Sequence, residues 1–471
     1  MSHHKPDPNV KVNLTIDRIP VTVPEGTRIL EAAKQANINI PVLCEHPDLC
    51  KRALCRICVV ECDGRGKLVA ACANDVWEGV NIVTINQRLS LIRKTIVELI
   101  LANHPQDCLS CVRNKTCELQ ALALKYCVGA SSFENSVDKS AATIENDTLV
   151  RDMSKCIKCG RCVEACQEIQ TIGALNTSHR SDEFTVSTAY KQSLKKSPCV
   201  FCGQCASVCP VGAIYAHDQT ADVQAALNDN NEKKIALISP VLASAVNTEL
   251  GFEPGTVTAG KLIKAVRLLG FDKVYDASTA ADYINSNISR EIDKRKENSY
   301  AKLPIISGCS DGVTRFITNF YPDLEFFLAS GKNSRHEYAS AVKREYAIEA
   351  GVNISDVTLV YFVPCIAQKY AARQEKTSLF LTAKELARMI KMAGIIVDTL
   401  PDDMSENQAD NPCKNTFDNI NIHIPQPLGA EKKVTVYGYA QARVVMEKIQ
   451  KGGCNADWVE IFSCSGKNCM Q

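Results

Sequence analysis

The chain has 471 residues, and its 54 Lys and Arg residues nearly balance 53 Asp and Glu residues, for a formal net charge of +1. A chain of this length favours about three domains, and its near-neutral charge offers no basic field for collecting nucleic acid. No run reaches the roughly 18 apolar residues that a membrane-spanning helix needs, and residues 1–7 lack the apolar stretch of a secretory signal. We therefore expect a cytoplasmic protein that binds neither nucleic acid nor a membrane.

Cysteine is the informative residue type, because the chain contains 24 of them. Thiols in a reducing compartment are poorly placed to form disulfides, so closely spaced cysteines there predict metal binding. A disulfide-stabilised scaffold is the alternative, and both the size of the chain and the missing secretory signal count against it.

The N-terminal region alternates apolar and polar residues over 10–16 and again over 19–23, which predicts a two-stranded hairpin. Thr27 is the expected N-cap of a helix over residues 29–36. Apolar residues over 89–101 predict a second helix.

A cysteine-rich loop lies between these helices, and its expected ligands are Cys44, Cys55, Cys58 and Cys72. Three thiolates on one loop and a fourth from the next strand can enclose a [2Fe-2S] cluster, which needs two thiolates per iron. Structural zinc is the alternative, although zinc sites favour two separated CxxC pairs. The pattern resembles the plant-type ferredoxin module, a β-grasp fold, in the variant found at the start of respiratory NADH dehydrogenase large subunits and iron hydrogenases.

A second set follows the second helix directly and consists of His104, Cys108, Cys111 and Cys117. One imidazole with three thiolates could hold zinc or iron, and the position beside the first module favours iron. The set resembles the His-ligated [4Fe-4S] site of the same two families. A neutral imidazole in place of a thiolate is expected to raise the reduction potential of this cluster.

Two similar runs come after residues 131–148, whose Ser, Asn, Asp and Ala content predicts a linker. Each run has the spacing of bacterial two-cluster ferredoxins, in which the fourth cysteine of one run ligates the cluster of the other run. The expected ligands are Cys156, Cys159, Cys162 and Cys209 for one [4Fe-4S] cluster, and Cys199, Cys202, Cys205 and Cys166 for the other.

Beyond residue 230 cysteine becomes sparse, and short apolar strands alternate with helices. Strands are expected at 235–238, 274–275 and 357–362, with a helix at 262–269. This alternation predicts an α/β domain built on parallel strand pairing.

The segments Ile238–Pro240, Pro254–Val257 and Leu269–Asp276 closely resemble the catalytic domain of [FeFe]-hydrogenases. That family holds its H-cluster, a cubane bridged to a two-iron subsite, with cysteines from three motifs. In the gapless match to the first motif the ligand cysteine falls on Ser310, while the family's proton-donor cysteine survives as Cys309. Shifting this alignment by one residue would make Cys309 the ligand and leave no cysteine as proton donor. In either alignment, therefore, the ligand or the proton donor is missing.

The other two motifs are altered as well. In the second, Cys365 keeps the thiolate that anchors the cubane, but the family's lysine has become Gln368, with Lys369 one place away. In the third, the cysteine spacing has lengthened and Met has become Phe462. A plain [4Fe-4S] cluster without the two-iron subsite stays open, and its ligands would be Cys309, Cys365, Cys464 and Cys469. Complete loss of metal is the alternative.

The resemblance also implies a broken proton path. The family's two relay glutamates fall on Ile288 and Glu291, and its relay serine falls on Ala329. Ile and Ala side chains offer neither donor nor acceptor, so they cannot carry a proton.

The expected fold is multi-domain and combines α+β and α/β units. Its parts in chain order are a [2Fe-2S] ferredoxin-like domain at 8–86, a His-ligated [4Fe-4S] module at 87–130, the linker at 131–148, a two-[4Fe-4S] ferredoxin domain at 149–222, and a degenerate iron-hydrogenase-like domain at 230–471.

We therefore expect an iron–sulfur electron-transfer subunit with one [2Fe-2S] and three [4Fe-4S] clusters, no two-iron subsite and no catalytic residue. The sequence has no G-x-G-x-x-G or other flavin motif, so partners must supply donor and acceptor. The resemblance implies a hydrogenase-type or NADH/ferredoxin oxidoreductase complex, with electron bifurcation left open. Its other members would be an NADH-binding flavoprotein subunit, a small [2Fe-2S] subunit, and a catalytic hydrogenase paralogue or ferredoxin. An active divergent [FeFe]-hydrogenase and a hydrogen or redox sensor stay open as alternatives.

Overall fold

The computed structural model describes residues 7–49, 52–63, 68–129, 131–133, 142–145, 148–180, 184–229, 231–239, 241–277, 279–297, 302–330, 334–370, 378–405 and 432–464. Cys469, one of the predicted ligands, lies outside these ranges. Within them no helix combines the length and the apolar character needed to cross a membrane.

The N-terminal unit is a mixed sheet with one helix against it, and its predicted hairpin is confirmed. Strand β1 (Lys11–Ile16) pairs antiparallel with β2 (Ile19–Pro24) through a turn in which Asp17 and Arg18 both have positive φ, as a tight hairpin requires. The sheet has the order β2-β1-β5-β3-β4. Its other strands are β3 (Val59–Cys62), β4 (Leu68–Ala70) and β5 (Asn81–Val83).

The predicted N-cap of helix α1 (Ile29–Gln35) is wrong by one residue. Arg28, not Thr27, occupies the N-cap position. The hydroxyl of Thr27 donates to the carbonyl of Pro24 at 2.7 Å, so it closes the turn after β2 and does not cap the helix.

Two helices, α2 (Gln87–Ala102) and α3 (Glu118–Lys125), lead from this unit to the centre of the molecule. The Asn86 side chain caps α2 by accepting from Leu89 N at 2.8 Å. The apolar faces of both helices share one buried core with the cysteine-rich module that follows. This shared core fixes the position of the cysteine loop between the two helices.

The central module has a small antiparallel sheet in the order β10-β7-β6 and two short helices. The elements are β6 (Thr143–Glu145), β7 (Leu149–Arg151), α4 (Arg161–Glu164), β8 (Asn176–Ser178), β9 (Thr185–Ser187), α5 (Gln204–Ser207) and β10 (Ile214–Ala216). Strand β6 lies inside the segment 131–148, which was predicted to be a linker. Its residues pair with β7, so this part of the segment belongs to the sheet.

The C-terminal region has two separate parallel sheets, which confirms the predicted parallel pairing. One has the order β12-β11-β14-β15 and the other β13-β17-β16. The strands are β11 (Lys233–Ile238), β12 (Lys273–Asp276), β13 (Ile305–Gly308), β14 (Val357–Val363), β15 (Ser378–Thr382), β16 (Lys433–Tyr437) and β17 (Trp458–Phe462).

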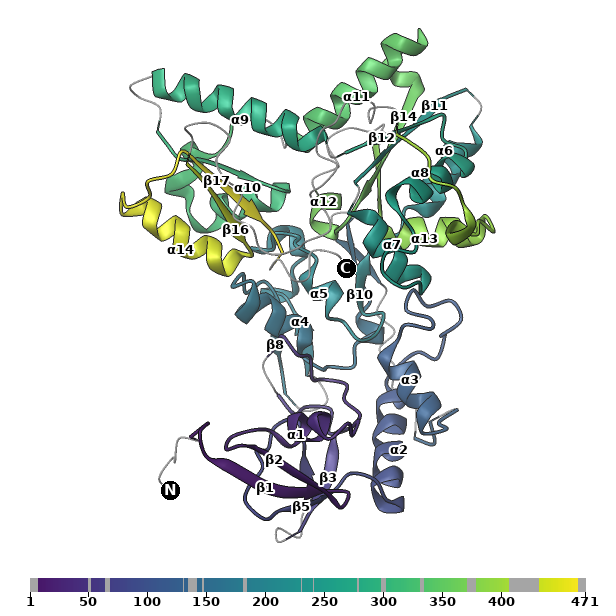
Figure 1. The fold of residues 1–471 in the computed structure, drawn as a ribbon, viewed down its shortest axis with the longest axis vertical. Coiled ribbons are helices and arrows are strands. Elements are labelled where there is room, and N and C mark those ends of the chain that lie inside the picture. The colour runs from purple at the N-terminus through teal and green to yellow at the C-terminus, as the bar shows by residue number, and fades with distance from the viewer. Residues whose placement is uncertain are drawn as a thin grey trace.

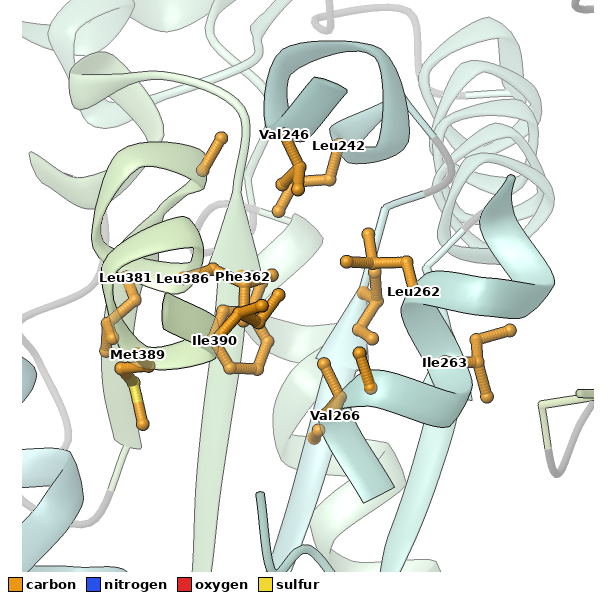
Figure 2. Packing of buried hydrophobic residues seen from close by; sticks show 14 of the residues in the cluster. Leu242, Val246, Leu262, Ile263, Val266, Phe362, Leu381, Leu386, Met389 and Ile390 are labelled. Carbon is orange, nitrogen blue, oxygen red and sulfur yellow. The ribbon is translucent and has the colours of Figure 1, made fainter. Parts of the chain in front are cut away.

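Helices cover these two sheets. They are α6 (Thr220–Asn228), α7 (Leu242–Leu250), α8 (Ala259–Leu268), α9 (Thr279–Glu297), α10 (Asp311–Phe320), α11 (Ser334–Ala350), α12 (Ile366–Tyr370), α13 (Ala383–Met392) and α14 (Tyr439–Gln450). In Figure 1 the N-terminal sheet lies at one end, the module with α4 and α5 in the middle, and the two parallel sheets side by side at the other end. Figure 2 shows how α7, α8 and α13 bury their apolar faces on the first parallel sheet.

Candidate functional site

The four cysteines of the first predicted set converge at one end of the N-terminal sheet. The Cys44 side chain is hydrogen-bonded to Cys55 and Cys72, and Cys58 is hydrogen-bonded to Cys72. The bonds from Cys55 and then Cys72 lower the pKa of Cys44, so a thiolate forms there most readily. This arrangement of four buried or half-buried thiols fits a small sulfur-ligated iron centre.

The second set surrounds a short series of turns between α2 and α3. His104 is buried, and its Nδ1 atom has no hydrogen-bond partner among the described residues, while the ring hydrogen-bonds the backbone of Lys155. Burial lowers the pKa of His104, so the ring is neutral and its free nitrogen can bind a metal.

The cysteines of this set are partly exposed on the turns. Backbone N–H of Gln120 donates to Cys117 Sγ at 3.5 Å. Arg113 reaches the neighbouring module, where its guanidinium donates to the carbonyl of Cys209 at 2.9 Å. The second set therefore borders directly on the third.

The third and fourth sets line two cavities in the central module. One cavity is lined by Cys156, Cys159, Cys162 and Cys209, and the other by Cys166, Cys199, Cys202 and Cys205. Each cavity thus takes three cysteines from one run and the fourth from the other. Among the described residues no group of three or more His, Cys, Asp or Glu side chains is arranged to hold a single metal ion; the cysteines of each cavity surround a common space.

The two runs share one backbone conformation. Lys158 and Phe201, at equivalent positions, both have positive φ (56° and 51°), and so do Gly160 (78°) and Gly203 (77°). In each run this conformation directs a backbone N–H to the first sulfur, from Lys158 N to Cys156 Sγ and from Phe201 N to Cys199 Sγ, both at 3.4 Å. Such donors stabilise a thiolate.

The burial of these sulfur atoms is a further test of whether the two cavities suit iron–sulfur clusters. It raises the pKa of Cys156 to about 11 and those of Cys159 and Cys199 to about 12. Thiols in such apolar cavities stay protonated on their own, whereas a bound metal holds them as thiolates. All cysteines of the first four sets are free thiols, which contradicts a disulfide scaffold there and fits iron–sulfur clusters.

The segments matched to the first and third H-cluster motifs meet at a buried group of hydroxyls, at the place expected for the C-terminal pocket. Ser310, after β13, lies 3.0 Å from Ser463 across their hydroxyl oxygens, and the Tyr439 hydroxyl lies 2.9 Å from Ser463 Oγ. Ser463 N donates to Cys309 Sγ at 3.4 Å, and Gln170 Nε2 donates to the Ser463 carbonyl at 3.2 Å. All five side chains are buried, and we call them the hydroxyl cluster.

The other predicted ligands of this pocket do not complete a set of four free thiols. Cys365 is partly buried and not in a disulfide, whereas the sulfur of the buried Cys464 is in a disulfide. Among the predicted ligands in the described ranges, only Cys309 and Cys365 are outside a disulfide, where a cubane needs four ligands. A fourth [4Fe-4S] cluster here stays a prediction.

Lys369 does not take the place of the lysine lost at Gln368. Its Nζ atom donates to the Glu385 carboxylate at 2.7 Å and to the carbonyl of His217 at 2.5 Å. Gln219 N also donates to Glu385, at 2.9 Å. These bonds join α12 and α13 to the start of α6, so Lys369 is a structural residue at that junction.

The positions matched to the proton path lie in an apolar environment. Ile288 is 2% exposed and shares a cluster with Ile284, Ile292, Ile305 and Trp458, against which Ala329 packs. Glu291 instead binds Arg295 at 2.6 Å and accepts from Ser330 N at 3.0 Å. Ile288, at the position of the family's first relay glutamate, therefore has no group that can carry a proton.

Sequence reasoning missed Ser463, Tyr439 and Gln170. Ser463 is next to Cys464 in the third motif. Tyr439 and Gln170 match no motif, and only the tertiary fold brings these two residues close to Ser463 and to each other.

Four family models match the chain. The C-terminal domain of the iron-only hydrogenase large subunit matches residues 232–422, and a 2Fe-2S iron–sulfur cluster binding domain matches 9–87. The iron–sulfur binding region of NADH-ubiquinone oxidoreductase G matches 93–132, and the ferredoxin-like domain of NADH-quinone oxidoreductase subunit 3 matches 147–215. As predicted, iron–sulfur domains of both kinds precede a hydrogenase-like domain.

Two similar curated proteins cover most of the chain, and a third covers less than half of it. The NADP-reducing hydrogenase subunit HndD of Solidesulfovibrio fructosivorans is 34% identical over 410 residues, which span 83% of this chain and 70% of that protein. Iron hydrogenase 1 of Clostridium pasteurianum is 30% identical over 400 residues, spanning 83% and 69%. The NADPH-Fe(3+) oxidoreductase subunit alpha of Geobacter sulfurreducens is 35% identical over 207 residues, 44% of this chain and 24% of that protein.

Solved structures overlap parts of the chain. An NAD⁺-reducing [NiFe]-hydrogenase is 30% identical with a TM-score of 0.41 and covers 44% of this chain and 87% of its own. An [FeFe]-hydrogenase from Chlamydomonas reinhardtii is 19% identical with a TM-score of 0.45 and covers 54% and 83%.

Proposed function

This chain belongs to the iron-only hydrogenase large-subunit family, and from that premise we propose that it is an electron-transfer subunit that has lost hydrogen chemistry. It carries one [2Fe-2S] and three [4Fe-4S] clusters on the four sets of Cys and His ligands described above. It works inside an oxidoreductase complex and holds no functional H-cluster.

The contrast between the ferredoxin cavities and the C-terminal pocket carries this proposal. The cavities present sulfur ligands with N–H donors, such as that of Lys158, aimed at them. In the C-terminal pocket the family's ligand position is Ser310, whose hydroxyl is engaged with Ser463 in the hydroxyl cluster. A serine hydroxyl is harder and far less acidic than a thiol, so it is a poorer ligand than a thiolate for the iron of a cubane.

The apolar cluster around Ile288 supports the same conclusion. Hydrogen turnover requires proton delivery as well as electrons, and buried Ile and Ala side chains cannot relay a proton. Two separate requirements of hydrogen chemistry are therefore missing.

The protein's own residues perform electron transfer by holding and shielding the redox centres. Bound clusters supply single-electron storage without proton chemistry. The cysteine thiolates anchor them, backbone N–H groups stabilise the sulfur charge, and the apolar walls around Val211 and Phe201 exclude water from both cavities.

The partners follow from the relatives. HndD is by name a subunit of an NADP-reducing hydrogenase, and the Geobacter relative is a subunit of an NADPH-Fe(3+) oxidoreductase. We propose an NADH-binding flavoprotein subunit and a small [2Fe-2S] subunit as partners, with a catalytic hydrogenase paralogue or ferredoxin as the further electron carrier.

The test is anaerobic purification followed by metal analysis and activity assays. One [2Fe-2S] and three [4Fe-4S] clusters give about 14 irons per chain, and a fourth cubane would give about 18. The chain alone is expected not to reduce dyes with NADH and to become reducible by NADH when the flavoprotein is added. NADH-dependent dye reduction by the pure chain, or zinc in place of iron in the first set, would contradict the proposal.

The second candidate is an active divergent hydrogenase, which the retained Cys309 and Cys365 favour. Infrared bands of iron-bound carbonyl and cyanide, together with hydrogen evolution from a reduced dye, would decide for it.

A further inference from the structure

Arg161 is a buried cation at the meeting point of three cysteine-rich segments. It opens α4 in the first ferredoxin run, and only 4% of its surface is exposed. Its guanidinium donates bidentate hydrogen bonds to Glu118, at 2.6 and 2.7 Å to the two carboxylate oxygens. The same group donates to the carbonyl of Glu45 at 2.8 Å.

Each of these contacts lies one residue away from a predicted ligand. Arg161 itself precedes Cys162, Glu118 follows Cys117, and Glu45 follows Cys44. One side chain therefore joins the loops that carry the [2Fe-2S] set, the His-ligated set and the first ferredoxin set. The charge of Arg161 also acts on the Cys159 and Cys44 thiols, which belong to two of those sets.

A second contact holds the same loops together. Arg52, three residues before Cys55, forms an ion pair with the buried Glu164 of α4. Leu54 also packs close to Gly160, with 3.4 Å between the Leu54 Cδ1 atom and the position of a Cβ on that glycine. The first and third sets thus face each other across a packed interface, and the Arg161 guanidinium lies within it.

The internal repeat supplies the natural comparison. Gln204 occupies in the second run the position that Arg161 occupies in the first, after a glycine of the same conformation. Gln204 is buried too but carries no charge. The two runs therefore differ in charge, because the first run buries Arg161 and Glu164 where the second has the uncharged Gln204 and Ser207.

We infer that Arg161 sets the reduction potentials of the clusters around it, and that its charge, balanced by Glu118, keeps those clusters more oxidising than they would be without it. This inference rests on the cluster assignment proposed above. A cation favours the reduced, more negative state of a neighbouring cluster, and burial limits screening by water and salt. Glu118 opposes this effect, less strongly because 43% of its side chain is exposed.

The experiment is an anaerobic redox titration, followed by electron paramagnetic resonance, on the full chain and five variants, one of them a control. In Arg161→Gln the potentials of the [2Fe-2S] set and the first ferredoxin set should fall, while the Cys199 set should stay unchanged. In Glu118→Gln the same two potentials should rise, by less. The double variant should return towards the wild type, and Arg161→Lys, which keeps the charge, should stay closest to it.

Potential shifts of opposite sign in Arg161→Gln and Glu118→Gln would identify an effect of charge. A loosened interface would instead shift the potentials without regard to the sign of the removed charge. Arg88→Gln is the matched control, since Arg88 is 68% exposed and pairs with Glu61 at the surface. Its potentials should equal those of the wild type.

Unchanged potentials in Arg161→Gln, or shifts of the same sign in Arg161→Gln and Glu118→Gln, would overturn the inference. If Arg161→Gln does not fold, Glu118→Gln and Arg161→Lys decide it alone. A wild-type chain without a [2Fe-2S] signal would instead refute the cluster assignment, and the inference with it.

Discussion

Lys369 is the most informative residue to change in the C-terminal domain, because it stands one place from the lost lysine of the hydrogenase pocket. The structure gives it another role, an ion pair with Glu385 in which the two side chains are 1% and 6% exposed. We predict that Lys369→Met destabilises this domain and has no effect on any hydrogen-related activity.

The magnitude follows from what remains after the change. Removing one partner of a buried ion pair costs about 3–5 kcal/mol, since the other charge stays buried and unpaired. Glu385 keeps donors from Thr382 N at 2.7 Å, Thr382 Oγ1 at 2.8 Å and Gln219 N at 2.9 Å. These bonds favour the lower limit, about 3 kcal/mol, which lowers the unfolding midpoint of a domain of this size by roughly 6–12 °C.

Differential scanning calorimetry of the anaerobic protein measures this shift. The double variant Lys369→Met with Glu385→Gln should recover part of the loss, because no buried charge is left. Arg388→Met is the control: its ion pair with Asp218 is about one-third exposed on both sides and should cost no more than about 1 kcal/mol. An unchanged midpoint in Lys369→Met would refute the structural role of Lys369.

Three further predictions concern the metal centres. His104→Cys should lower one reduction potential in a redox titration, because a thiolate adds negative charge, and the other signals should not move; an unchanged titration would mean that His104 is not a ligand. Gly212→Ala should cost about four irons per chain, since a Cβ there would lie 2.9 Å from Cys111 Sγ, whereas Gly129→Ala, with nothing within 4 Å, should keep full iron content. Ser310→Cys should leave hydrogen evolution at background, because groups lost as a unit are not restored singly; turnover above background would show that the thiolate alone was missing.

Much of the fold could be predicted because its signals are local. The hairpin at β1 and β2 and the helix α2 follow from periodicity within a few residues. The alternation of short strands with helices predicted parallel pairing in the C-terminal region, although not which strands pair. The spacing of the ferredoxin runs likewise predicted which cysteines share a cavity. Short-range patterns of this kind need no knowledge of the tertiary fold.

The contacts that could not be predicted join distant parts of the chain. Arg161 and Glu45 are 116 residues apart, and Gln170 and Ser463 are 293 apart. Neither pair forms a motif, because a single sequence carries no signal for which buried polar groups will find each other. The N-cap of α1 was missed for a smaller reason, the competing turn at Thr27.

The exchange of cysteines between the two runs has a consequence for how the protein is made. Cys209 lines the cavity of the first run and Cys166 that of the second, so neither cavity closes until both runs have folded. Maturation should therefore be all-or-none for this pair, with no stable species that carries a single cubane. The same coupling makes both cubanes sensitive to oxygen. Oxygen damage that removes the cubane of the first cavity releases Cys209, which belongs to the second run, and so loosens the run that holds the other cubane.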